Sequence, residues 1–175
     1  TSNGLVSQHF IPFCADNNIG IVVASSYLAI IGLFNFMGSI GSGWLADKFD
    51  NYKLLAAFYS VRGLSLVYLP FSSLDIFYLT LWAIFFGLDF IATIPPTGRF
   101  CSKFFGSIDG PIAFAWIFSI HQIGAASAAY GAGRTRDIFL TYEPVFLVAG
   151  IACFIATVLL LSFRLAPQSQ LTFSS

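Results

Sequence analysis

The residues most able to do chemistry in this chain are a few polar and ionisable side chains inside long apolar stretches. Arg62, Asp89 and Asn35 fall at a similar depth in three such stretches, and at a rise of about 1.5 Å per helical residue Arg62 lies about 12 Å from the nearer end of its own. Ionisable groups are expensive in lipid and usually face protein or a water-filled cavity. The depths therefore predict a buried ion pair or an anion site, or a packing clamp in which Arg62 reaches back towards Asp47.

Further polar residues in the apolar stretches are candidates for the wall of a solute cavity. Together with Asn35 and Asp89 they are Gln8, His9, Thr93, His121 and Gln122. His121 can carry a proton near neutral pH. In a continuous helix Asp89, Thr93 and Thr97 share one face, because they recur every four residues. For each candidate, a simple interhelical hydrogen bond is the competing interpretation.

The composition predicts a protein that lies in a lipid bilayer. The 175 residues are 57% hydrophobic and 9% charged, whereas a soluble domain has about 25% charged residues. The formal net charge of zero gives no reason to expect a nucleic acid partner. The sequence shows no hydrolytic motif, no phosphate-binding glycine loop and no metal-ligand spacing of its cysteines, so we expect neither an enzyme nor a cofactor or metal.

The apolar stretches predict an all-α, polytopic bundle of transmembrane helices. A spanning helix needs about 20 apolar residues. By this measure the helices are expected at about 1–15, 21–46, 54–71, 76–94, 111–133 and 144–163. The first is too short to span and is interpreted as a helix cut at its start, in a chain that is a fragment; the other five are expected to be complete. Pro95 and Pro96 are expected to stop the fourth helix, and the polar tail 167–175 to be disordered.

The basic residues predict the orientation in the membrane, because cytoplasmic loops carry an excess of Lys and Arg. One set of alternating loops and ends contains Lys48, Lys53, Arg99, Lys103 and Arg164. The other set contains Arg134 and Arg136. The first set, and with it the C-terminus, is expected on the cytoplasmic side of the cell membrane.

An internal repeat relates the two halves of the chain. Gly41-x-Gly43-x-x-x-Asp47-x-Phe49-x-x-Tyr52 matches Gly131-x-Gly133-x-x-x-Asp137-x-Phe139-x-x-Tyr142 at one constant shift. A weaker echo relates Gly4-Leu5 and Ile11-Pro12 to Gly87-Leu88 and Ile94-Pro95. Since the first copy ends the second predicted helix and the second copy ends the fifth, on the opposite side, the repeat predicts two inverted three-helix units, which are typical of secondary transporters.

The charged turn between the second and third helices resembles the loop motif of the major facilitator superfamily, Gly-x-x-x-Asp-Arg/Lys-x-Gly-x-x-Lys/Arg. Gly43, Asp47, Lys48 and Lys53 fit it, and Asp50 stands where the family usually has glycine. The resemblance implies that residues 1–166 are the C-terminal six-helix half of such a transporter, with the N-terminal six-helix half as its partner. Secondary active transport of a small solute by alternating access, with proton coupling as an option, is the implied function.

Arg62-Gly63 and Ile94-Pro95-Pro96-Thr97 resemble a microbial subgroup close to the monocarboxylate and oxalate-formate transporters, which implies an organic anion as solute. Monocarboxylate transporters place Asp-x-x-x-Arg midway along the second of these helices, where this chain has Asn35 and Ser39. Both charges are missing, so carboxylate binding by that pair is in doubt.

The loop motif also predicts a conformational latch, and two other functions remain open. A carboxylate at Asp47 lies at the negative end of a helix dipole and needs a cation, for which Lys48 and Arg62 are the expected partners, with Gly43 and Lys53 completing the latch. One alternative is an integral membrane enzyme built on His9, Asp89 and His121. The other is a channel or a structural membrane subunit.

Overall fold

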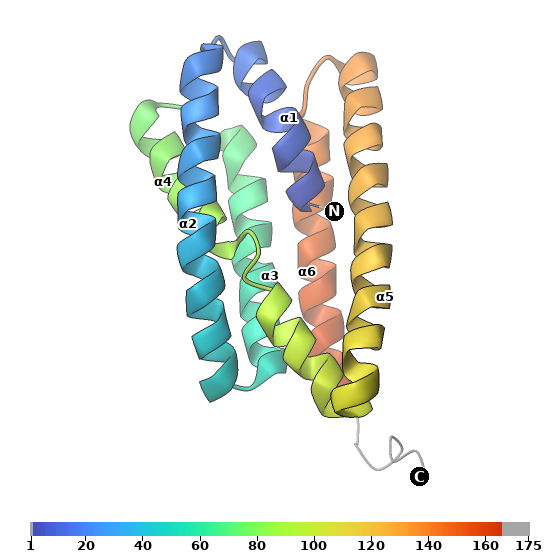
Figure 1. Cartoon of the computed structure of the whole chain (residues 1–175). Coiled ribbons are helices and arrows are strands. Elements are labelled where there is room, and N and C mark those ends of the chain that lie inside the picture. Colours follow the sequence, from blue (N-terminus) through green and yellow to red (C-terminus); the bar gives the residue numbers. More distant parts are fainter. Residues whose placement is uncertain (1, 166–175) are drawn as a thin grey trace.

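The computed structural model describes residues 2–165, with side chains through residue 162, and these residues form an antiparallel bundle of helices (Figure 1). The predicted tail 167–175 lies outside the described residues. The helical elements are α1 (Ser2–Asp16), α2 (Ile21–Lys48), α3 (Asn51–Tyr68), η1 (Leu69–Phe71), α4 (Ile76–Asp89), α5 (Ile94–Phe139) and α6 (Glu143–Leu165). No strand occurs within this range, so the all-α prediction is confirmed.

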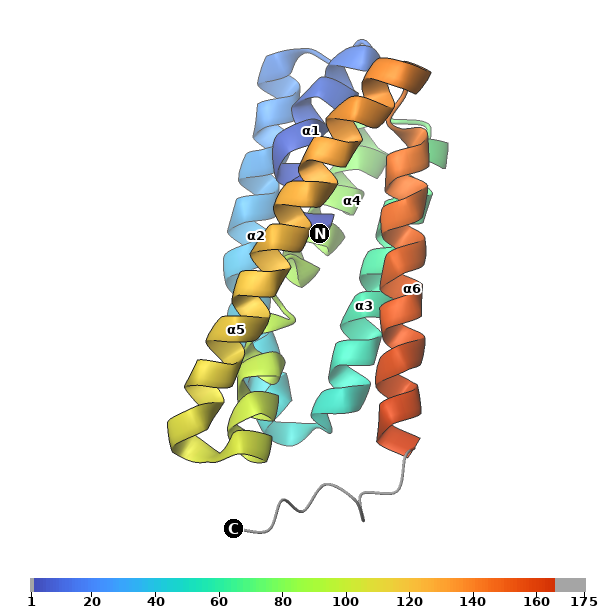
Figure 2. The ribbon, with the colours of Figure 1, turned by 90° about the vertical axis from the view of Figure 1, so that its right-hand side faces the viewer.

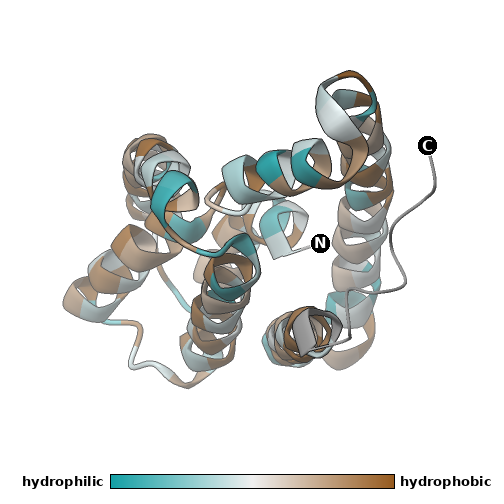
Figure 3. Ribbon diagram, turned by 90° about the horizontal axis from the view of Figure 1, so that it is seen from below, coloured by the Kyte–Doolittle hydropathy of each residue, from teal (hydrophilic) through white to brown (hydrophobic). Residues whose placement is uncertain are grey.

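The outer surface of the bundle is suited to lipid. In the described part of the chain, four helical stretches are long and apolar enough to cross a membrane: Ile21–Lys48, Asn51–Phe71, Ile76–Phe139 and Glu143–Ser162. Seen from below, the ribbon is hydrophobic along its helices, and hydrophilic residues gather at the end that faces the viewer (Figure 3). Large apolar side chains such as Trp116 and Ile123, each 69% exposed, face outward. Such a surface is stable only against hydrocarbon or another protein face, and the protein therefore lies in a membrane.

The structure differs from the sequence prediction between residues 89 and 111. The expected fourth helix, 76–94, ends at Asp89, and Phe90 to Thr93 form turns. Pro95 and Pro96 do not stop a helix there; they begin α5, because a proline lacks the N–H that the first helical turn leaves unbonded in any case. The residues around 95–105, expected to be a connection, are helical, so the fourth pass through the bundle is a helix interrupted in its middle.

The chain reverses direction within α5 at Gly106. This residue has φ +80° and ψ −178°, a conformation that only glycine adopts readily, and two helices meet at it. The backbone of Gly110 then passes so close to Ser102 that an added Cβ at Gly110 would lie 2.7 Å from the Ser102 Cα. The long stretch Ile76–Phe139 therefore contains two passes, and the second rises along the bundle from its lower end (Figure 2).

Helix packing follows the inverted repeat. α1 packs on α5, α4 packs on α2, and α3 packs on α6. Two glycines that the sequence echo relates make equivalent contacts: an added Cβ at Gly4 would lie 2.8 Å from the Ala125 carbonyl of α5, and one at Gly87 would lie 2.8 Å from the Ile31 carbonyl of α2. If each of the first three passes is replaced by its counterpart among the last three, the α1–α5 contact becomes the α4–α2 contact, and the α3–α6 contact becomes itself. Two inverted three-helix units require this relation.

Candidate functional site

A buried ion pair lies at the break between α4 and α5. Nε of Arg62, on α3, donates to Oδ2 of Asp89 at 2.7 Å, and both side chains are almost completely buried, at 3% and 4% exposure. Nη2 of Arg62 also donates to the main-chain oxygens of Asp89 and Phe90. These carbonyls lie where the helical hydrogen bonds of α4 end. One guanidinium therefore neutralises the carboxylate and donates to backbone oxygens that have lost their helical partners at the break.

Two asparagines from α1 and α2 complete this polar centre. Nδ2 of Asn3 donates to the Phe90 oxygen at 2.7 Å. Asn35 lies on α2 beside Phe90 in the wall of a cavity of about 230 Å³, which Val6 and Ser7 of α1 also line. Oδ1 of Asn3, of Asn35 and of Asp89 are all buried and have no hydrogen-bond partner. The sequence placed Asn35, Arg62 and Asp89 at one depth, and the structure brings them to one region; Asn3 was missed because a single Asn near an end carries no pattern.

His9 is held by two hydrogen bonds away from that centre. Its Nε2 lies 2.8 Å from the Ala129 oxygen of α5, and its Nδ1 lies 3.2 Å from the Tyr142 hydroxyl. Because the Ala129 carbonyl can only accept, Nε2 carries the hydrogen, and Nδ1 of a neutral ring accepts from Tyr142. His9 thereby joins α1 to α5 and to the turn before α6.

The remaining polar candidates are separate from the ion pair. Gln8 on α1 is exposed, as are His121 and Gln122 on α5, where the His121 ring stacks on Phe118 at 6.1 Å between centroids. Thr93 directly precedes α5, and its main-chain oxygen accepts from the Thr97 hydroxyl at 2.6 Å. The expected common face of Asp89, Thr93 and Thr97 does not form, because the helix is interrupted between the first two.

The charged turn after α2 is arranged differently from the expected latch. Asp47 pairs with Arg99 of α5, whereas Arg62 is occupied by Asp89. Arg62 points into the bundle because the carboxylate and open carbonyls at the break offer it more hydrogen bonds than the loop would. Lys48 lies 4.0 Å above the Trp44 ring. From the sequence, Arg99 was expected only to be a basic residue of a loop, and its pairing with Asp47 was not predicted.

The turn itself is closed by a cap rather than by glycine. Asp50, which replaces the glycine of the motif, accepts hydrogen bonds from the backbone N–H groups of Tyr52 at 2.9 Å and Lys53 at 3.3 Å and thus begins α3. Gly43 has open space where a Cβ would lie. Its role in this structure is therefore not one of close packing.

A second ion pair lies at the other end of the bundle. Arg136, near the end of α5, donates to Asp16 at the end of α1 at 2.7 Å. This hydrogen bond holds the pKa of the Asp16 carboxyl below its usual range. The shift in sequence that relates Gly4 to Gly87 also relates Asp16 to Arg99, so one member of each ion pair lies at an equivalent position of the two units, with opposite charge.

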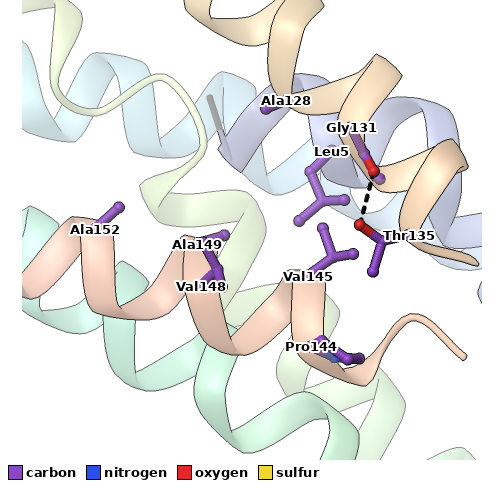
Figure 4. A pocket seen from close by; sticks show the side chains of 10 residues that line it. Leu5, Ala128, Gly131, Thr135, Pro144, Val145, Val148, Ala149 and Ala152 are labelled. Atoms are coloured by element: carbon purple, nitrogen blue, oxygen red, sulfur yellow. Dashed lines mark hydrogen bonds between the residues drawn. The ribbon is translucent and has the colours of Figure 1, made fainter. Parts of the chain in front are cut away.

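An apolar cavity lies between α5 and α6, and Leu5 of α1 also lines it (Figure 4). Its volume is about 320 Å³, and its wall is almost entirely Ala, Val, Gly and Pro side chains. The only hydroxyl among them, that of Thr135, donates to the Gly131 oxygen at 2.8 Å (Figure 4). The cavity has no polar group free to orient a polar molecule.

The groups expected of a membrane enzyme do not gather in one place. His9 binds Ala129 and Tyr142, Asp89 binds Arg62, and His121 stacks on a phenylalanine. Within residues 2–165, no cluster of three or more His, Cys, Asp or Glu side chains is arranged to hold a metal ion. The arrangement instead offers hydrogen bonds and a neutralised ion pair inside an apolar bundle, which suits recognition of a polar molecule more than bond cleavage.

Comparison with known proteins places the chain in a family. The model of a protein family described as "Uncharacterised MFS-type transporter YbfB" matches residues 4–161. Neither the curated proteins nor the solved structures gave a match. The family match extends from α1 into α6 and thus includes the ion pair, the helix break and the charged turn.

Proposed function

Because this chain belongs to the family of MFS-type transporters, we propose that it is the C-terminal six-helix half of a secondary active transporter that moves a small solute by alternating access. The family also points to a transporter rather than an enzyme. Substrate sites of secondary transporters lie near the middle of the membrane, where helices are interrupted. The observation that carries this proposal is the interrupted fourth pass, with the Arg62–Asp89 pair at the break and a cavity beside it.

The proposed solute path runs along the polar residues of α1, α2, the interrupted fourth pass and the second half of α5. Asn35 and Asp89 lie at its centre, and Gln8, His121 and Gln122 are exposed, as residues of an open cavity wall would be. Thr93 lies at the break. His9 is the weakest of the candidates for direct contact, because both of its ring nitrogens already have partners. Proton coupling is proposed to involve His121, whose imidazole is exposed.

The partner of this bundle is proposed to be the N-terminal six-helix half. An alternating cavity needs two walls, and the exposed apolar face of α5, which includes Trp116 and Ile123, supplies surface for the second. The site of action is proposed to be the cell membrane, with the turn after α2 and the C-terminus in the cytoplasm, since most of the basic residues lie on that side.

Uptake into vesicles tests the transport proposal whatever the solute is. The full-length transporter is reconstituted, the vesicles are incubated in a small-molecule cell extract, and their contents are compared with those of empty vesicles by mass spectrometry. We expect at least one solute to be enriched, and Asp89→Ala to abolish that enrichment while Asn51→Leu, at the start of α3, retains it. No enrichment of any solute contradicts the proposal, and equal uptake by the present chain alone indicates a channel.

The Asp47–Arg99 pair is proposed to act as a latch at the cytoplasmic end, with Lys48 and Lys53 beside it and Gly43 preceding it. The pair is partly exposed, so it contributes only about 0–1 kcal/mol to stability, yet an energy of this size is enough to shift a balanced two-state equilibrium severalfold. Asp47→Arg should change the accessibility of cysteines at the cavity mouths, and the exchange Asp47→Arg with Arg99→Asp should restore it. If the double variant shows the same cysteine accessibility as Asp47→Arg alone, the pair is not the latch.

A further inference from the structure

The break between α4 and α5 presents hydrogen-bond acceptors. Oδ1 of Asn3, Oδ1 of Asn35 and Oδ1 of Asp89 are buried without a partner, and they come from α1, α2 and the end of α4. The side chain of Asn3 cannot be turned around, because its Nδ2 is bound to the Phe90 carbonyl, which can only accept. A buried oxygen without a partner is unfavourable by about 1–3 kcal/mol in general, so three of them in one region call for a ligand that donates.

The backbone at the same break has few donors to offer. The start of α5, where an anion would normally be bound by free backbone N–H groups, contains Pro95 and Pro96, which have none. The neighbouring N–H groups of Ile94 and Thr97 are already bound to the oxygens of Ile91 and Thr93. A carboxylate or phosphate group would therefore meet oxygens and no free backbone donor at this helix start.

The charges at the break already cancel. Nε and Nη2 of Arg62 are engaged by Asp89 and by the Asp89 and Phe90 carbonyls. A cationic solute would enter a buried site without a net opposite charge, and an anion would compete with Asp89 for Arg62; both arrangements are unfavourable in an apolar surrounding. An uncharged donor meets neither difficulty.

From these contacts we infer that the solute recognised at the break is an uncharged molecule that donates hydrogen bonds through hydroxyl groups to Asn35, Asn3 and Asp89. This inference rests on the proposed transport function and replaces the organic anion that the sequence resemblance implied. Arg62 is a positioning residue in it: the guanidinium holds the Asp89 carboxylate and the Phe90 carbonyl, and so fixes the direction of the free oxygens.

Binding of matched probes to the chain in lipid nanodiscs tests the inference. Glycerol, propionate and propylammonium share a three-carbon skeleton and differ in charge and donors; xylitol and glucose extend the uncharged series. Binding is measured by saturation-transfer NMR, with empty nanodiscs as the blank. We expect a saturable signal from the uncharged probes that propionate and propylammonium neither give nor displace.

Two variants and one control locate the signal. Asn35→Leu and Asn3→Leu keep the size of the side chain and remove the acceptor oxygen, so each should weaken binding about tenfold. Asn51→Leu is the matched control, because Oδ1 of Asn51 is also buried without a partner but lies at the start of α3, at the loop. This variant should bind as the unchanged chain does.

The outcomes separate the inference from the transport proposal. Any of three results overturns the inference: no binding of the uncharged probes, binding of propionate or propylammonium with equal affinity, or a loss of binding that is confined to Asn51→Leu. Specific binding of the uncharged probes with no solute enriched in vesicles leaves the inference in place and removes the transport proposal. Enrichment of a carboxylate solute in vesicles leaves the transport proposal in place and overturns the inference.

Discussion

At the residue scale, the Arg62 side chain serves two purposes at once. It neutralises a carboxylate in the middle of a membrane bundle, and it binds two backbone oxygens at a point where the fourth pass is interrupted. Neither Asp89 nor the break is stable in an apolar surrounding without that guanidinium. The ion pair is therefore part of the backbone structure as well as of the candidate site.

Removing one member of this pair should be far more harmful than removing both. Arg62→Ala leaves a buried carboxylate without its cation and takes one donor from each of the Asp89 and Phe90 carbonyls, and it should lower the free energy of unfolding by about 3–5 kcal/mol. The double variant Arg62→Met with Asp89→Leu should lose clearly less, because no unpaired charge stays buried. Unfolding in detergent, followed by circular dichroism, measures both. A double variant less stable than Arg62→Ala would show that the charges themselves hold the bundle together.

At the scale of elements, close helix contacts depend on single glycines. α2 and α4 approach so tightly that a Cβ added at Gly38 would lie 1.9 Å from the Leu88 oxygen. The backbone of a neighbouring helix cannot move aside as a flexible side chain can. Near the end of α4, Gly87 in turn lies against the Ile31 backbone of α2, so two close contacts keep the fourth pass against α2 next to the break.

Gly38→Ala should force α2 and α4 apart. Overpacking of this kind lowers the free energy of unfolding by about 1–3 kcal/mol. Gly41→Ala, in the same helix, is the matched control, since nothing lies within 4 Å of its added Cβ and alanine favours helix more than glycine does. Thermal unfolding of both variants in detergent gives the comparison. Equal stability of the two would contradict the tight contact.

The reversal within α5 depends on a backbone conformation rather than on a contact. Gly106→Ala keeps open space around the new Cβ but forces alanine to φ +80°, which should lower the free energy of unfolding by about 1–3 kcal/mol. Gly98→Ala, within the preceding helix and also without a close neighbour, should be neutral or stabilising. Denaturation of the two variants side by side measures the difference, and a loss of stability confined to Gly98→Ala would show that the chain does not reverse at Gly106.

At the scale of the whole molecule, the two inverted units place one ion pair at each end of the bundle. Asp47–Arg99 and Asp16–Arg136 each tie a helix of one unit to a helix of the other. An inverted pair of units gives each face of the membrane the same kind of connection. Which face is cytoplasmic is set by the basic residues, and it is accessible to experiment.

Serine-to-cysteine variants test the orientation. Ser73, between η1 and α4, and Ser107, at the reversal in α5, are both exposed or partly exposed and lie on opposite faces according to the prediction. An impermeant thiol reagent added outside intact cells should label Ser73→Cys and should not label Ser107→Cys until the cells are opened. The natural cysteines Cys14, Cys101 and Cys153 are buried, so the background should be low. The reverse pattern would invert the topology.

The sequence by itself determined the features that depend on local composition and spacing. Apolar stretches of membrane length predicted the all-α bundle, because backbone groups in lipid must bond within their own segment. The repeat around Gly41 and Gly131 predicted two inverted units, and counting the rise per residue predicted that Arg62 and Asp89 lie at one depth.

The tertiary structure alone decided which groups meet. Whether Pro95 and Pro96 end one helix or begin the next depends on whether another helix binds the carbonyls of the break, and Arg62 and Asn3, distant in sequence, do so. The partner of Asp47 was decided in the same way: Arg99 comes within reach only because the chain after the break runs along α2. Hydropathy is a property of one segment, whereas hydrogen bonds at a break join several, and so the spacing of residues predicted the bundle and the common depth of Arg62 and Asp89 but not the break or the partner of Asp47.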